Sequence, residues 1–203
     1  NKSIIFISKL SLKDVKTFIL TGIIMNFLAS VVIDSLPNNL VSNSYNSLMN
    51  VAVTGNWLQI LLITGVITPV VEELIFRYGI TKIIKQNKFF KKPDVSSIYI
   101  SAFVFGLVHF NIIQSTYAFI FGIILAYVYI KTDNLLSSIL IHIGVNASSV
   151  LYSFMPVMLQ NICLIVMSII FFIIVIRNIL VIRNNSSHSN VNNFLSYLLY
   201  QTK

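Results

Sequence analysis

The sequence predicts an all-α protein, a polytopic transmembrane helical bundle of about six helices. Hydrophobic residues make up 56% of the 203-residue chain and charged residues only 10%, and the mean hydropathy is +0.85. Soluble domains carry about 25% charged residues, so this composition indicates an integral membrane protein. The apolar residues are gathered into stretches near the length of about 20 residues that spans a bilayer.

Six apolar segments follow one another along the chain, with short polar connections between them. The fourth is short for a span. We expect residues 1–182 to form one transmembrane domain and residues 183–203, which begin with an Asn- and Ser-rich stretch, to form a polar tail. The six segments are 15–36, 57–80, 95–110, 117–130, 135–153 and 157–182.

The connections alternate in positive charge. Lysines precede the first segment and fill the connection after the second, whereas residues 37–56 and 111–116 contain no Lys or Arg. The positive-inside rule therefore predicts that both termini are cytoplasmic and that the protein is a multi-pass protein of the cell membrane. The net charge is +8, and the basic residues lie beside apolar segments. This placement favours anionic lipid headgroups over nucleic acid as partners. The abundant Ile and Asn suggest a bacterial source.

Three charged residues interrupt the second apolar segment: Glu72, Glu73 and Arg77. Each costs about 2.5–3.5 kcal/mol at the centre of a membrane helix, so their presence requires an explanation. Glu73 and Arg77 are four residues apart, with the acid on the N-terminal side, which predicts an ion pair within the helix. Glu72 lies about 100° around the helix from Glu73 and is left to face a different neighbour.

Two further pairs have the same spacing of four residues. Phe105 and His109 lie in the third segment, so the ring of Phe105 can pack against the turn that carries His109, and His142 and Asn146 share one face of the fifth. Each feature also has a structural interpretation: Glu and Arg can clamp helices together, and an isolated His or Asn can simply hydrogen-bond between helices. Their occurrence together favours a functional site.

These residues resemble a known family. Glu-Glu-x-x-x-Arg at 72–77, Phe-x-x-x-His at 105–109 and His-x-x-x-Asn at 142–146 are similar to the three ordered motifs of the CPBP (Abi-type) intramembrane proteases. That family includes type II CAAX prenyl endopeptidases and bacterial proteins linked to bacteriocin processing and self-immunity. The resemblance covers residues 57–153. It implies an endopeptidase that hydrolyses a peptide bond of a membrane-associated peptide or protein.

The resemblance also implies roles for individual residues. Glu72 would be the general base, and His109 would help to hold and polarise the attacking water. His142 and Asn146 would donate hydrogen bonds to the oxyanion of the tetrahedral intermediate. Three further residues would position these groups without reacting themselves: Glu73, Arg77 and Phe105.

The need for a metal is left open by the residues alone. Glu72, His109 and His142 could ligate zinc, and family members have been classed as metalloproteases on that basis. The sequence lacks the His-Glu-x-x-His pattern of many zinc proteases, and we favour a mechanism without a cofactor. Two alternatives remain: a non-catalytic membrane immunity or scaffold protein, and a transporter, which usually has interrupted helices in repeated halves.

Overall fold

The computed structural model describes residues 9–36, 55–170, 172–173 and 176. These residues contain six helices and no strand, which confirms the predicted all-α class. The chain divides into two units, Asn1–Gln160 and Asn161–Lys203. The predicted polar tail and the end of the sixth segment lie outside the described residues. The helices are α1 (Leu12–Asp34), a long helix (Trp57–Gln86), α6 (Pro93–Leu107), α7 (Ile112–Thr132), α8 (Leu135–Ser153) and a last helix (Val157–Ile170).

Four of these helices are long and apolar enough to cross a membrane: α1, the long helix, α7 and α8. The chain is therefore a multi-pass membrane protein. α6 and the described part of the last helix are also apolar but shorter, so four of the six expected spans reach this length within the described part of the chain. The expectation of a short fourth segment was wrong, because α7 has 21 residues. The polar run at residues 114–116 separates its first two isoleucines from the apolar segment and made the helix look shorter in the sequence.

Local side-chain chemistry explains where the helices begin. Ser11 and Asp14 form a capping box at the start of α1, and the side chain of Asn111 accepts the Ile113 N–H at the start of α7, at 3.1 Å. Asn134 caps α8 in the same way. Asp133, with φ 47°, ends α7 in the left-handed conformation that is typical of helix C-termini. The turn between α7 and α8 is therefore fixed by two adjacent residues.

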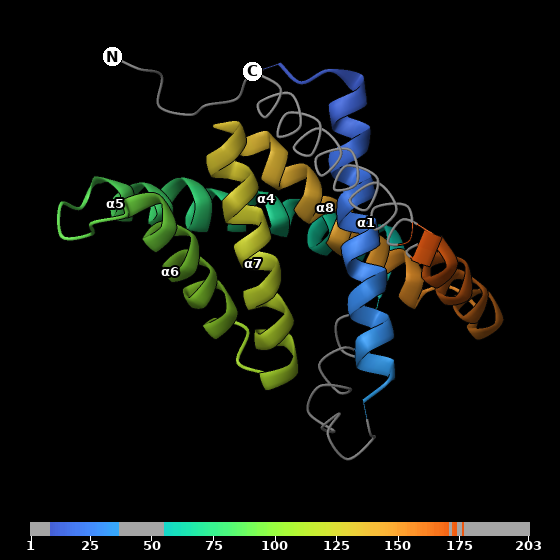
Figure 1. Cartoon of the computed structure of the whole chain (residues 1–203). Coiled ribbons are helices and arrows are strands. Elements are labelled where there is room, and N and C mark those ends of the chain that lie inside the picture. The colour runs from blue at the N-terminus through green and yellow to red at the C-terminus, as the bar shows by residue number, and fades with distance from the viewer. Residues whose placement is uncertain (1–8, 37–54, 171, 174–175, 177–203) are drawn as a thin grey trace, which may run out of the picture. The chain divides into compact units, whose positions relative to one another are not determined.

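The long helix is continuous but not uniform. It consists of α3 (Trp57–Ile60), η1 (Leu61–Ile67), α4 (Thr68–Glu73), η2 (Leu74–Ile80) and α5 (Thr81–Gln86). η1 and η2 are wider π-helical turns, in which an N–H donates to the carbonyl five residues back. Such turns occur frequently at functional sites. They flank α4, which carries both glutamates and runs across the view in Figure 1.

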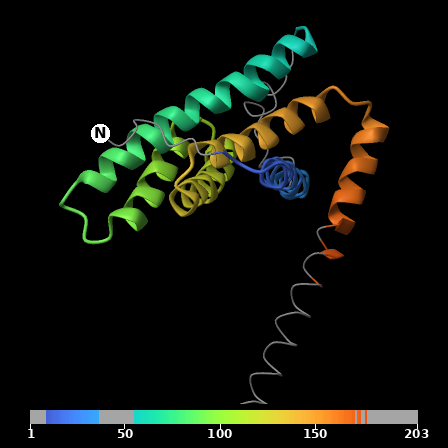
Figure 2. The same ribbon diagram turned by 90° about the horizontal axis from the view of Figure 1, so that it is seen from above.

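Packing between helices is closest where α1 meets α8. A Cβ atom on Gly22 or Gly144 would collide with the backbone of the other helix. Further along, the rings of Phe27 and Tyr152 meet edge to face with centroids 5.7 Å apart. Because both contacts run in the same order along the chain, α1 and α8 point in the same direction. α6 and α7 form a helical hairpin (Figure 1), and α1 is seen nearly end-on in Figure 2.

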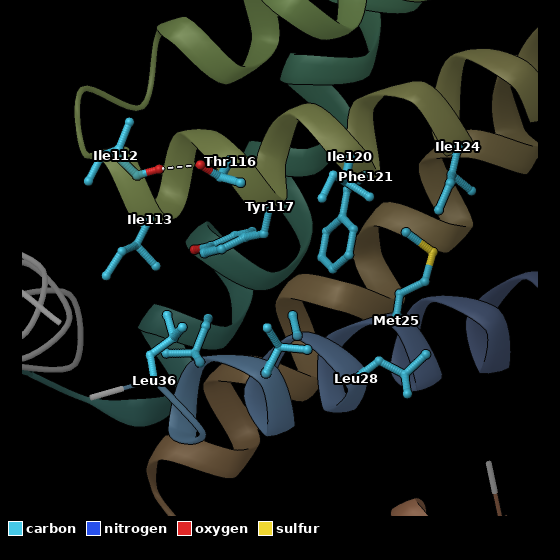
Figure 3. Close-up of a pocket in the computed structure, with 13 residues that line it drawn as sticks. Met25, Leu28, Leu36, Ile112, Ile113, Thr116, Tyr117, Ile120, Phe121 and Ile124 are labelled. Atoms are coloured by element: carbon cyan, nitrogen blue, oxygen red, sulfur yellow. Dashed lines mark hydrogen bonds between the residues drawn. The ribbon is translucent and has the colours of Figure 1, made fainter. Parts of the chain in front are cut away.

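An apolar pocket of about 420 Å³ lies between α1 and α7. Figure 3 shows Met25 and Leu28 of α1 facing Tyr117, Phe121 and Ile124 of α7 across it. No residue of the three sequence motifs lines this pocket. The polar residues of the second, third and fifth segments therefore form a separate feature of the fold.

Candidate active site

Glu73 and Arg77 form the predicted ion pair. Arg77 Nε lies 3.3 Å from Glu73 Oε2, and both side chains are 0% exposed. Arg77 also donates from Nη2 to the carbonyl of Gly122 on α7, at 3.3 Å, and its guanidinium stacks over the ring of Phe105. A buried charge is tolerated only when it is paired and hydrogen-bonded. The pair therefore places the two opposite charges in contact and ties the long helix to α6 and α7.

His142 lies between the two glutamates. Its Nδ1 is 2.9 Å from Glu73 Oε1, and its Nε2 is 3.4 Å from Glu72 Oε2. An ionised carboxylate only accepts hydrogen bonds, so Nδ1 of His142 carries a proton and donates it to Glu73. The sequence analysis paired Glu73 with Arg77 alone. The structure adds a second partner, so that Arg77, Glu73 and His142 form one connected chain of contacts.

Glu72 differs from its neighbour in exposure. Its side chain is 24% exposed, whereas Glu73 is fully buried. Its contact with Nε2 of His142, at 3.4 Å, is longer than a strong hydrogen bond. Glu72 is therefore the accessible carboxylate of the pair, as its position around the helix had predicted.

His109 lies in the turn that follows α6, which corrects the expectation that it is part of the third helix. α6 ends at Leu107, and Phe110 adopts a left-handed conformation with φ 53°. His109 Nδ1 lies 2.7 Å from the carbonyl oxygen of Phe105, one of the carbonyls that a helix C-terminus leaves without a backbone donor. Because a carbonyl only accepts, Nδ1 carries the proton. In the neutral ring, Nε2 is then free to accept a hydrogen bond.

Asn146 lies one helical turn after His142 on α8 and contacts the long helix. Its Nδ2 donates to the carbonyl oxygen of Thr64 in η1, at 3.2 Å. Since a carbonyl cannot donate, this contact fixes which end of the Asn146 amide faces η1. The second N–H of Nδ2 remains available for another acceptor.

Phe105 contacts the charged and imidazole groups together. Its ring meets His109 and His142 edge to face, with centroids 4.9 and 5.6 Å away, and Arg77 lies 4.7 Å from its centroid. It also packs against Phe76, at 5.0 Å. The predicted contact between Phe105 and the turn that carries His109 is confirmed. Phe105 thus links all three motifs.

The residues proposed as zinc ligands do not fit a zinc site in this arrangement. Catalytic zinc sites use three protein ligands around the metal. Over residues 9–36 and 55–176, where described, no group of three His, Cys, Asp or Glu side chains is arranged to hold a metal ion. Both nitrogens of His142 face carboxylates instead.

Sequence reasoning missed several residues that position the site. Ser101 is fully buried and donates to the carbonyl of Phe76, at 2.9 Å, which links α6 to η2. Thr64 and Gly122 contribute through their backbone carbonyls, which side-chain patterns cannot reveal. The glycines at 22 and 144 did carry a signal, because small residues mark close helix contacts in membranes.

The fold and the site together define a multi-pass membrane protein with a buried carboxylate and imidazole centre, built from the long helix, α6 and α8. Residues 54–148 match the family model described as type II CAAX prenyl endopeptidase, Rce1-like. This segment contains all three motifs, and the match confirms the family that they predicted. The chain thus carries a domain of a protease family. No curated protein matches the chain, and no solved structure does so either.

Proposed function

We propose that this protein is an intramembrane endopeptidase that uses a glutamate-activated water to hydrolyse a peptide bond. The observation that carries the proposal is that Glu72 of the long helix contacts His142 of α8, while Asn146, one turn further along α8, contacts the same long helix. The ring of Phe105 meets both His142 and His109, which brings His109 to the same centre. Intramembrane ionisable groups mark function more often than structure. The match of residues 54–148 to a protease family supports the same conclusion.

In the proposed reaction, Glu72 removes a proton from a water molecule while Nε2 of His109 accepts a hydrogen bond from the same water. The water oxygen forms a bond to the carbonyl carbon of the scissile peptide. Glu72 then returns the proton to the leaving nitrogen as the C–N bond breaks, giving an amine and a carboxylic acid that keeps the second hydrogen of the water. A positioned acid and base of this kind contributes typically 10²–10⁴-fold to the rate.

His142 and Asn146 are the proposed oxyanion donors. Glu73, held by Arg77, accepts from Nδ1 of His142 and so stabilises the charged imidazolium, whose Nε2–H then donates. The contact between Nε2 and Glu72 is 3.4 Å long, so a substrate oxygen can replace it with little loss. The second N–H of Asn146 supplies the other donor. Removing one such donor typically lowers kcat about 10²–10³-fold.

The substrate class that fits a site within apolar helices is a membrane-associated peptide or protein. The matching family is described by its action as a CAAX prenyl endopeptidase, which makes a prenylated CAAX peptide the first substrate to test. Processing of a bacteriocin or peptide precursor, or a role in self-immunity, is the second. A non-catalytic scaffold would use the same helices without cleavage.

The decisive experiment compares the purified wild-type chain with Glu72→Gln in lipid vesicles. We expect the wild type to cleave either a farnesylated CAAX peptide or peptides found by comparing membranes that contain each variant. Glu72→Gln should fold equally well and lose cleavage about 10³-fold. Lys85→Ala, at an exposed ion pair outside the site, is the matched control. Equal peptide profiles for the wild type and Glu72→Gln would refute the protease and leave the scaffold.

A further inference from the structure

Pro69 lies in the first turn of α4, three residues before Glu72, and is fully buried. A proline has no backbone N–H, so the carbonyl that would accept from that position loses its donor. In the adjoining π-helical turn η1, donors bond five residues back, and the carbonyl five residues before Pro69 is that of Thr64. The sequence therefore predicts an unsatisfied Thr64 carbonyl wherever this turn is π-helical.

The ordinary α-helical donor is absent from Thr64 as well. That donor would be the N–H of Thr68, which instead bonds the carbonyl of Ile63. The Thr64 oxygen accepts from Nδ2 of Asn146 on α8, at 3.2 Å. The side chain of Asn146 thus donates to this partly buried carbonyl in the place of the backbone N–H that is missing.

We propose that Pro69 is a positioning residue for the oxyanion site: it keeps the Thr64 carbonyl free of backbone donors, so that this carbonyl orients the Asn146 amide. The inference rests on the proposed function for its effect on catalysis. The contact holds the NH₂ end of the amide toward the long helix, one turn along α8 from His142. The second N–H of Asn146 is thereby kept for the substrate oxygen, and the amide oxygen is kept away from it.

Replacing Pro69 with alanine should raise the melting temperature and lower kcat. Alanine restores an N–H in the middle of a helix, so the protein should melt at a higher temperature. The same N–H competes for the Thr64 carbonyl and releases Asn146, and misplacement of a catalytic group by about 1 Å can cost about 10²-fold. We expect Pro69→Ala to lower kcat about 10²-fold with KM unchanged. Pro93→Ala, at the first turn of α6, is the matched control and should retain wild-type kcat.

A second replacement separates the missing N–H from the shape of proline. Lactic acid, introduced at position 69 as an ester, has the alanine side chain but no N–H. It should keep kcat within a few-fold of wild type, whereas Pro69→Ala should not. Equal kcat for the ester and for Pro69→Ala would overturn the proposal, since the ring and not the absent donor would then matter.

A double-mutant cycle of melting temperatures tests the contact between Asn146 and Thr64 without a measurement of activity. Asn146→Ala should lower the melting temperature when Pro69 is present and leave it unchanged in Pro69→Ala, because the Thr64 carbonyl then has a backbone donor. Independent, additive shifts would refute the positioning role. If the wild type shows no cleavage that depends on Glu72, the proposed function fails, and this cycle still decides whether Pro69 orients Asn146.

Discussion

α8 presents two faces that hold the fold in different ways. On one face, Gly144 touches the backbone of α1 at Gly22, and the contact is made by shape alone. On the other face, His142 and Asn146 contact the long helix through two carboxylates and a carbonyl. Gly144 lies two positions after His142 and two positions before Asn146. A single turn of helix therefore carries both kinds of interface.

The difference between the two faces shows how the position and the rotation of a helix are defined within a membrane. Lipid is as apolar as leucine, so helices gain little from burying apolar surface, and small residues allow close packing instead. The polar face adds direction, since each hydrogen bond fixes one atom against another. We infer that the glycine face brings α8 to its place and that the polar face sets its rotation and the orientation of the reactive groups.

Arg77→Ala should have the largest effect on stability. It leaves Glu73 charged, buried and without its cation, a change that costs about 3–5 kcal/mol in buried pairs. Unfolding in mixed detergents would measure this loss. The double variant Glu73→Gln/Arg77→Met removes both charges and should be more stable than Arg77→Ala. A double variant less stable than Arg77→Ala would show that packing, and not the unpaired charge, causes the loss.

Asn146→Ala should separate catalysis from stability on the polar face. We expect kcat to fall about 10²–10³-fold while the free energy of unfolding falls by only about 1 kcal/mol, as for one hydrogen bond. Steady-state kinetics and unfolding of the same preparation give both values. Ser148→Ala is the control on the same helix, because its hydroxyl bonds within α8. A loss of kcat in Ser148→Ala as large as that in Asn146→Ala would contradict the assignment.

Gly22→Ala tests the other face of α8. The added Cβ would meet the carbonyl of Ile141 and the backbone of Gly144, and such overpacking costs about 1–3 kcal/mol. The fraction that folds should keep wild-type KM, since no catalytic group is touched. Gly79→Ala is the matched control, because the nearest atom to its Cβ, the Leu74 carbonyl oxygen, is 3.5 Å away. Equal losses of stability in both variants would remove the argument for a close contact between α1 and α8.

Lys85→Ala should have the smallest effect. Lys85 and Asp94 form an ion pair with a 2.9 Å contact, but their side chains are 39% and 59% exposed. Exposed pairs contribute about 0–1 kcal/mol, and salt weakens them further. Unfolding at low and high salt should show a small difference that disappears at high salt. A loss comparable with that of Arg77→Ala would mean that the connection between α5 and α6 is a structural element of the fold.

Features that depend on one helix could be predicted from the sequence. The pair Glu73 and Arg77, the contact of Phe105 with His109, and the separation of Glu72 from Glu73 all follow from residues three or four apart or from the 100° turn per residue. The apolar pattern likewise identified the spans of α1, the long helix and α8. It failed at the end of α6, where the left-handed Phe110 places His109 in a turn.

Contacts between helices could not be predicted in the same way. His142 was expected to act together with Asn146, but its contacts with both glutamates depend on the rotation of α8 against the long helix. The acceptor of Asn146 is a backbone carbonyl, and every residue has one. No side-chain pattern distinguishes Thr64 until the π-helical turn and Pro69 are considered together.

The sequence by itself determined that this is a helical membrane protein with an acid, an imidazole and an amide at helical spacing, because composition and the period of 3.6 residues are local properties. It also predicted, through three motifs in order, the protease family whose model residues 54–148 match. Only the tertiary structure decided that Glu73 supports His142, that His142 lies between the two glutamates, and that η1 receives Asn146. Those outcomes depend on the distance between packed helices and on their relative rotation. Both are set by glycines and buried hydrogen bonds whose partners lie far apart in the chain.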